Sequence, residues 1–171
     1  MNMTFHISAA VAVLATVMVV TRTSAVHALL YLIVSLAAAA VVFYVLGAPF
    51  VAALEVIIYA GAIMVLFVFV IMMLNLGPQA AREERVWLSG RTWIGPGVLA
   101  AILLAELIYI LSGPAAPAQA AEVGPHEVAV ALFGPYVVGV ELASMLLAAG
   151  LVGAYHLGRR DTASTGGKGG E

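Results

Sequence analysis

Long apolar stretches separated by short polar connections dominate the chain. They predict helices at about residues 4–20, 26–46, 50–76, 93–111 and 135–157. Each stretch has enough consecutive apolar residues to cross the hydrocarbon core of a bilayer. The prolines fall in connections or near predicted helix ends, where a missing backbone N–H group is tolerated. The pattern therefore predicts an all-α, polytopic membrane protein in which residues 1–160 form a single domain of five transmembrane helices.

Composition agrees with this prediction. Of the 171 residues, 64% are hydrophobic and only 9% are charged, whereas a soluble domain carries about a quarter charged residues. A chain of this length cannot hide so much apolar surface in its own core, so lipid and other membrane subunits must cover it. The sequence contains no cysteine, which excludes disulfides, thiolate metal sites and thiol nucleophiles.

The cations indicate how the helices are oriented. All seven lysines and arginines follow the first, third or fifth predicted helix, and with five crossings these three places share one side. They are Arg22, Arg82, Arg85, Arg91, Arg159, Arg160 and Lys168. Because an excess of Lys and Arg marks the cytoplasmic side, we expect the N-terminus outside and the C-terminus in the cytoplasm. Residues 161–171, rich in glycine, threonine and serine, are expected to form a disordered cytoplasmic tail.

Three carboxylates lie inside predicted helices, namely Glu55, Glu106 and Glu141. Each lies five or six residues from the outer end of its helix, which places it roughly 8–9 Å deep. One interpretation is a polar layer that is accessible to protons or contacts partner subunits. The other is that the groups reach outward to headgroups or water. We favour the second for Glu106, whereas both stay open for Glu55 and Glu141, because each of these belongs to a larger pattern.

For Glu55, the pattern includes Tyr59 four residues later and then Gly61 within Ala-Gly-Ala. Glycine weakens a helix and lets backbones approach closely, so this segment is typical of a helix that lies among protein partners and can deform. For Tyr59, simple packing is the favoured interpretation. For Glu141, the pattern is a stripe that continues through Met145 to Tyr155 and resembles a helix interface.

Chemistry beyond these groups is sparse. The four histidines do not pair at ligand spacing, so no metal site is expected. No phosphate-binding loop, nucleophile motif or flavin fingerprint is present. The sequence therefore predicts neither a catalytic residue nor a cofactor-binding residue.

Two segments carry a family resemblance. The run from His27 to Leu76, and most specifically EVIIYAGAIMVLFVFVIMML within it, closely resembles the J subunits of the proton-pumping NADH–quinone oxidoreductase, respiratory complex I. The mitochondrial counterpart is the sixth mitochondrially encoded membrane subunit. The ending VELASMLLAAGLVGAYHLGRR, from Val140 to Arg160, is similar to the fifth helix of the same family.

The resemblance implies a five-helix subunit of the bacterial plasma membrane, beside the quinone-binding part of the membrane arm and packed with the A, H, K and N type subunits. Its third helix would carry a π-bulge that converts to regular α-helix and rotates the helix below it. The matching positions are Tyr59, Ala60, Gly61, Ala62 and Val65, with Glu55 beside them. The complex uses NADH, FMN, iron–sulfur clusters and quinone, and this chain would bind none of these cofactors and no nucleic acid.

The function expected from the resemblance is that of a non-redox subunit that helps couple quinone reduction to proton translocation through a deformable third helix. An alternative is a structural spacer that holds adjacent membrane subunits together. A small independent transporter is a third hypothesis, but three shallow carboxylates are too few for a self-contained polar path.

The cation pattern can be tested by mapping the topology. We expect a reporter fused after Lys168 to read cytoplasmic, and a reporter inserted within residues 115–123 to read external, because all seven cations share one side. Labelling of the 82–91 loop by an impermeant reagent added to intact cells would contradict the five-span arrangement.

Overall fold

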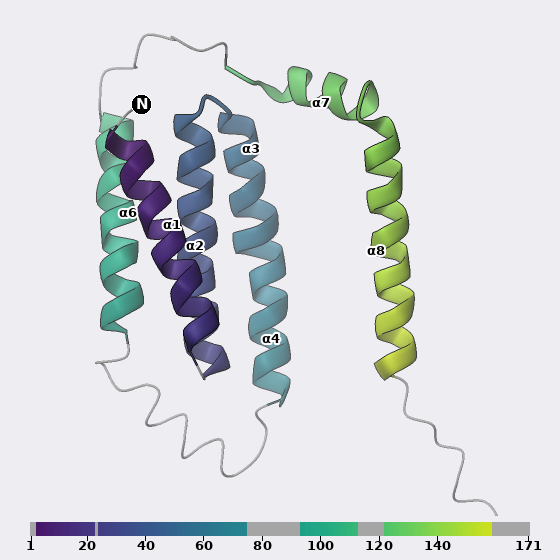
Figure 1. Ribbon diagram of the computed structural model, residues 1–171, viewed down its shortest axis with the longest axis horizontal. Helices are drawn as coiled ribbons and strands as arrows, with labels where there is room; N and C mark the ends of the chain where they lie inside the picture. Colours follow the sequence, from purple (N-terminus) through teal and green to yellow (C-terminus); the bar gives the residue numbers. More distant parts are fainter. Residues whose placement is uncertain (1–2, 23, 75–92, 113–121, 159–171) are drawn as a thin grey trace, which may run out of the picture. The chain divides into compact units, whose positions relative to one another are not determined.

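A computed structural model of the chain describes residues 3–22, 24–74, 93–112 and 122–158, and all its regular elements are helices (Figure 1). They are α1 (Met3–Thr21), α2 (Ala25–Val45), α3 (Pro49–Leu54), η1 (Glu55–Ile63), α4 (Met64–Leu74), α6 (Ile94–Ser112), α7 (Pro125–Phe133) and α8 (Val137–Gly158). Helices α3, η1 and α4 follow one another without a break and form one continuous rod (Figure 1).

Five helical segments are long and apolar enough to cross a membrane. They are Met3–Thr21, Ala25–Val45, Pro49–Met73, Ile94–Ser112 and Val137–Gly158. The predicted all-α class and the five spans are thus confirmed, with helix ends that differ from the predicted ones by a few residues. The orientation of the termini stays a prediction, and the 161–171 tail lies outside the described residues.

One described helix, α7, was not predicted from the sequence. It ends at Phe133, and Gly134, Pro135 and Tyr136 form a turn before α8 begins. The amide of Tyr136 donates to the carbonyl of Ala131 at 3.1 Å in this turn. Proline lacks an amide and its ring clashes with the carbonyl four residues earlier, so Pro135 separates two helices instead of beginning the fifth span.

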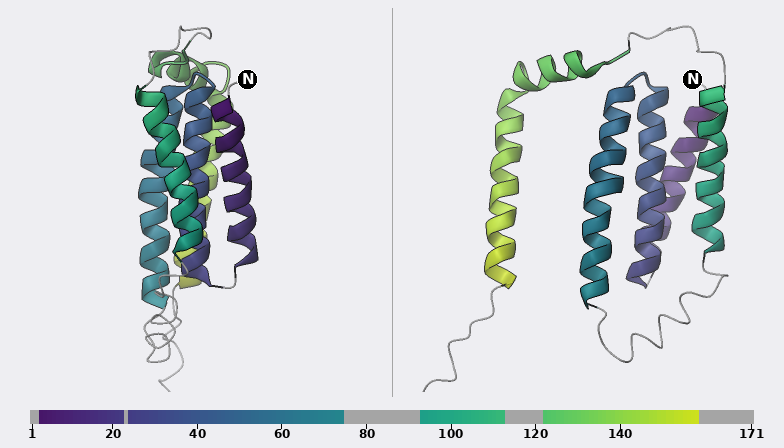
Figure 2. Two further views of the ribbon diagram at one scale, coloured as in Figure 1. Left: turned by 90° about the vertical axis from the view of Figure 1, so that its left-hand side faces the viewer. Right: turned by 180° about the vertical axis from the view of Figure 1, so that it is seen from behind.

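The contacts within the chain divide it into two compact units, and the boundary in the sequence lies between Gly124 and Pro125. The first holds α1 to α6 and the second holds α7 and α8. Whether the two together form the single domain predicted from the sequence stays a prediction. Within the first unit, α2 is the central helix, because it contacts α1, α6 and all three segments of the α3–η1–α4 rod (Figure 2).

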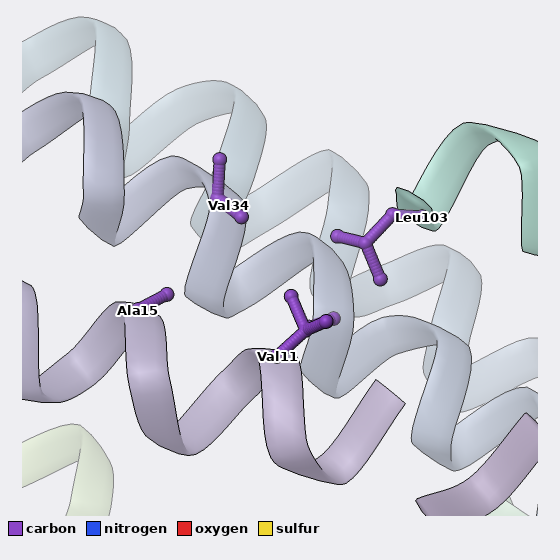
Figure 3. Packing of buried hydrophobic residues seen from close by; sticks show 5 residues of the cluster. Val11, Ala15, Val34 and Leu103 are labelled. Carbon is purple, nitrogen blue, oxygen red and sulfur yellow. The ribbon is translucent and has the colours of Figure 1, made fainter. Parts of the chain in front are cut away.

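The core of the first unit lies where α1, α2 and α6 meet. Val11 and Ala15 come from α1, Val34 and Ala38 from α2, and Leu103 from α6 (Figure 3). Both alanines are fully buried. Lipid tails are as apolar as leucine, so packing of small residues, rather than a hydrophobic driving force, brings membrane helices together. The two alanines allow the backbones of α1 and α2 to approach closely.

Hydroxyl groups add polar contacts to the α1–α2 interface. The hydroxyls of Thr16 and Ser35 lie 2.8 Å apart. The Thr16 hydroxyl donates to the backbone carbonyl of Ala12 in its own helix at 2.8 Å. The Ser35 hydroxyl therefore supplies the hydrogen to Thr16, or alternatively donates to the same carbonyl at 3.2 Å. Interhelical bonds of this kind contribute about 0.6 kcal/mol each on average, so the cluster stabilises the register of the two helices modestly.

The connection between α2 and α3 depends on a glycine. Gly47 has a φ of 86°, a backbone conformation that residues with a side chain rarely adopt. Its carbonyl accepts a hydrogen bond from the amide of Val123 at 2.8 Å. The turn therefore also anchors the segment that directly precedes the second unit.

At the opposite end of the bundle, Tyr31 fixes the start of α6. Its side chain is buried, and the guanidinium carbon of Arg22 lies 5.5 Å from the centre of its ring. A methyl group added at Gly95 would overlap the Tyr31 hydroxyl and would lie 3.2 Å from the Cζ atom of the ring. Gly95 is thus the residue of α6 that lets Tyr31 lie between the helices.

This contact predicts unequal effects for two nearby glycines. We expect Gly95→Ala to destabilise the protein by about 1–3 kcal/mol, the usual cost of overpacking, because the buried Tyr31 ring must move. Gly97→Ala is the control, since nothing lies within 4 Å of the added methyl group. The measurement is the melting temperature of the detergent-solubilised protein. Equal melting temperatures for the two variants would contradict the assigned role of Tyr31, and Tyr31→Phe should partly relieve Gly95→Ala.

Candidate functional site

Among the five described spans, the third contains a segment that is helical but not α-helical. Its middle segment, η1, is a π-helix of nine residues, Glu55–Ile63. At its end the amide of Met64 donates to the carbonyl of Tyr59, five residues earlier. π-Helices are rare, usually occupy a single turn, and are frequent at functional sites. A π-helix of this length in a membrane span therefore marks η1 as the candidate functional site.

The local sequence explains why an α-helix is not favoured here. Val56, Ile57 and Ile58 are consecutive β-branched residues, which lose side-chain freedom in a helix. Gly61 lowers helix propensity further. A Cβ atom at Gly61 would lie 3.2 Å from the carbonyl oxygen of Val56, five residues earlier. The glycine thus gives this carbonyl the room that the wider helix needs.

Two buried residues anchor the ends of the π-helix. Ala52 is buried just before it, and Met64, with 2% of its surface exposed, directly follows it. Between them η1 contacts α2 but buries none of its own residues completely within the chain. The side chain of Tyr59, in its centre, is 48% exposed. The segment thus has fixed ends and one open apolar side.

The structure places most of the residues singled out in the third helix inside this segment. Tyr59, Ala60, Gly61 and Ala62 lie within η1, Glu55 is its first residue, and Val65 lies in α4, just beyond its end. Among the described residues, Glu55 and Tyr59 do not hydrogen-bond to each other. Whether these residues change conformation stays a prediction.

Glu106 differs from the expectation. It was expected to reach outward to headgroups or water, but it is buried, with 7% of its surface exposed, so that expectation is wrong. The Ser8 hydroxyl on α1 donates a hydrogen bond to its Oε2 atom at 2.6 Å. The reason is that α6 packs against α1 and α2 and turns this side of the helix inward. Almost every face of α6 is apolar, so no pattern in the sequence indicates which side faces a neighbouring helix.

Glu141 lies in the second unit, on α8, and its side chain is exposed within the chain. Met145 and Tyr155, further along its stripe, are exposed as well, and no residue of α8 is buried within the chain. Within the second unit, α7 therefore leaves most of the surface of α8 uncovered.

The three carboxylates have different environments, and no cluster of acidic residues or histidines in the described parts of the chain could hold a metal ion. Glu106 is enclosed, Glu141 is exposed, and Glu55 is half-buried. The described residues thus form no metal centre. Their distinctive features are the π-helix η1 and the buried carboxyl group of Glu106. Nothing in the sequence indicated that Glu106 is buried. In the structure, the burial is evident from the hydrogen bond between Ser8 on α1 and Glu106 on α6.

Comparisons with known proteins agree on one family. The sequence profile of the family described as NADH-ubiquinone/plastoquinone oxidoreductase chain 6 matches residues 15–157, which is most of the chain. The match includes the π-helix, α6 and α8.

Bacterial proteins named NADH-quinone oxidoreductase subunit J are similar over nearly their full length. The subunit from Pseudomonas aeruginosa is 55% identical over 163 residues, which cover 94% of this chain and 98% of that protein. The subunit from Escherichia coli K12 is 53% identical over 169 residues, covering 95% of this chain and 89% of its own length. A subunit from Buchnera aphidicola (Schizaphis graminum) is 44% identical over 160 residues, which cover 93% and 98% of the two chains.

Proposed function

The chain belongs to the NADH-ubiquinone/plastoquinone oxidoreductase chain 6 family, and from this premise we propose that it helps couple quinone reduction to proton translocation. It would do so as a non-redox subunit of the membrane arm of complex I, by changing the shape of its third span. The observation that supports the proposal is η1, a nine-residue π-helix in the middle of an apolar span.

The mechanism is mechanical. Conversion of η1 to α-helix would change the number of residues per turn and rotate α4 about its axis. Phe67, Phe69 and Met72 on α4 are large and about half exposed or more, so rotation would move them toward or away from a neighbouring water path. Such a switch opens or closes a path without bond chemistry in the chain. It requires that the two helical forms differ by only a few kcal/mol, a condition that Gly61 and the three β-branched residues favour.

The exposed surfaces support a role inside a larger assembly. Large apolar side chains are exposed along α4 and α8, and lipid or other membrane subunits must cover them. We propose that the partners are the A, H, K and N type subunits of the complex, in the bacterial inner membrane. NADH, FMN and iron–sulfur clusters would bind to other subunits, and quinone would bind beside this one.

A structural spacer is the second candidate, and the openness of α8 favours it. A helix without a buried residue in its own chain is suited to filling the space between two neighbours. An independent transporter is less favoured, because three shallow carboxylates are too few for a self-contained polar path. Blue-native electrophoresis separates the last possibility from the others, since a subunit migrates with a very large complex and a transporter as a small oligomer.

Gly61 provides the test of switching. Leucine at this position adds bulk next to the Val56 carbonyl and biases the balance between the two helical forms. A bias of about 1.4 kcal/mol shifts such an equilibrium about tenfold. We expect Gly61→Leu to lower quinone reduction coupled to pumping several-fold, or to shift the ratio of resting to active enzyme. The complex should still assemble and oxidise NADH with an artificial acceptor. Gly61→Ala should be milder, since it adds a single methyl group.

Two controls make this result interpretable. Gly150→Ala changes a helical glycine of α8 with nothing within 4 Å in the chain, and it should leave coupled turnover at the wild-type level. Assembly on native gels must be normal for every variant. Wild-type coupled turnover in an assembled Gly61→Leu complex would refute switching and favour the spacer.

The exposed and half-buried carboxylates provide a second test. We expect Glu55→Gln and Glu141→Gln to retain most of the quinone reductase and pumping activity, because glutamine keeps the size and an acceptor oxygen. Glu→Ala at either position should cost more, since it also removes packing and hydrogen bonds. Proton uptake into vesicles and quinone reduction are measured together. Complete loss of pumping in an assembled Glu55→Gln complex would show that its protonation is part of the mechanism.

A further inference from the structure

Glu106 and Ser8 form a polar pair inside the first unit, apart from the π-helix. The Ser8 hydroxyl oxygen lies 2.6 Å from Oε2 of Glu106, within the usual range for an O–H···O hydrogen bond. Ser8 is fully buried and Glu106 is more than nine-tenths buried. The second carboxyl oxygen, Oε1, is enclosed and has no hydrogen-bond partner among the described residues. A buried carboxyl group with one partner for two oxygens calls for an explanation.

No described residue neutralises a negative charge at this position. The only described lysine or arginine is Arg22, which lies beyond the far end of α1, 14 positions after Ser8 and thus about 20 Å away along the helix. The titratable groups at the same end of these helices are His6 on α1, Tyr44 on α2 and Tyr109 on α6. All three are exposed, and none hydrogen-bonds to the pair.

The two protonation states of Glu106 differ in what they demand of this environment. A carboxylate needs hydrogen bonds to both oxygens and a counter-charge, because transfer of a lone charge out of water is very costly. A neutral carboxylic acid needs much less. With the proton on Oε1, the carbonyl oxygen Oε2 still accepts the hydrogen bond from the Ser8 hydroxyl, and only one uncharged O–H group then lacks a partner among the described residues. The observed contacts match the neutral acid.

We propose that Ser8 and Glu106 form a proton-binding site between α1 and α6, in which Glu106 holds a proton as a neutral carboxylic acid. Glu106 lies six residues before the end of α6 and Ser8 five residues after the start of α1, so the site is roughly 8–9 Å from the N-terminal end of the bundle. The proton comes from the aqueous phase at that end, and its loss would leave a carboxylate. The site does not depend on a change of shape in η1.

Infrared spectroscopy of the whole complex tests the proposal. The difference spectrum between wild-type and Glu106→Gln complexes should contain the C=O stretching band of a protonated carboxyl group, and the band should shift in D₂O. Ser8→Ala keeps the carboxyl group but removes its hydrogen-bond partner, so the band should move to higher frequency without disappearing. Ser8→Thr keeps the hydroxyl and should leave the band near its wild-type frequency.

The spectra distinguish a proton-binding site from a merely structural hydrogen bond. The proposal would be overturned if Glu106→Gln removed the stretching band of a carboxylate and not that of a protonated carboxyl group. Such a result would show that Glu106 is ionised and that another group in the complex balances its charge. Absence of any shift in Ser8→Ala would overturn the pairing. The Ser8→Ala and Ser8→Thr spectra decide the question without Glu106→Gln if that variant does not assemble. Glu141→Gln, which changes an exposed carboxyl group, should not remove the same band.

Discussion

Backbone hydrogen bonding in an apolar solvent is the constraint on which this structure depends. In the hydrocarbon region no water is available to bind free N–H and C=O groups, so each must find a partner within the chain. The five spans meet this demand as helices. The third span meets it in an unusual way, because η1 replaces the α-helical pattern with the π-helical one from Glu55 to Ile63. A π-helix alters the rotation of the helix beyond it and still satisfies the backbone, which a loop at this depth would not do. Such a segment can therefore change its helical form without leaving backbone groups unpaired in the membrane.

Side-chain packing determines how the helices associate, and it relies on small and polar groups. Lipid weakens the hydrophobic driving force between helices, so close approach depends on residues such as Ala15 and Ala38 and on the Thr16–Ser35 hydroxyl pair. The Tyr31 contact with Gly95 fixes one end of α6, and the Ser8–Glu106 hydrogen bond links α6 to α1 near the other. By contrast, η1 and α4 contact α2 and leave their other sides open. The first unit thus combines a firmly packed three-helix part with a less buried third span.

The two proposals concern different parts of this division. The proposed switch lies in the less buried span, where its motion would meet little resistance from the chain itself. The proposed proton-binding site lies in the packed part, where Glu106 is held in one geometry and shielded from solvent. The two proposals rest on different helices and different physical effects, namely helix geometry for η1 and burial of a polar group for Glu106.

The sequence by itself determined the class, the number of spans and the family, because these depend on composition, on the length of apolar runs and on a distinctive motif. The positions proposed for a bulge within the run EVIIYAGAIMVLFVFVIMML came from its family resemblance, and all of them except Val65 lie within η1. The helix α7 was missed because Pro135, near the expected start of the fifth helix, instead lies in a turn that separates α7 from α8. Only the tertiary structure decided that Glu106 is buried against Ser8 while Glu141 is exposed. The physical reason is that a helix in lipid is apolar on nearly every face, so periodicity no longer distinguishes a side that contacts another helix from a side that contacts lipid.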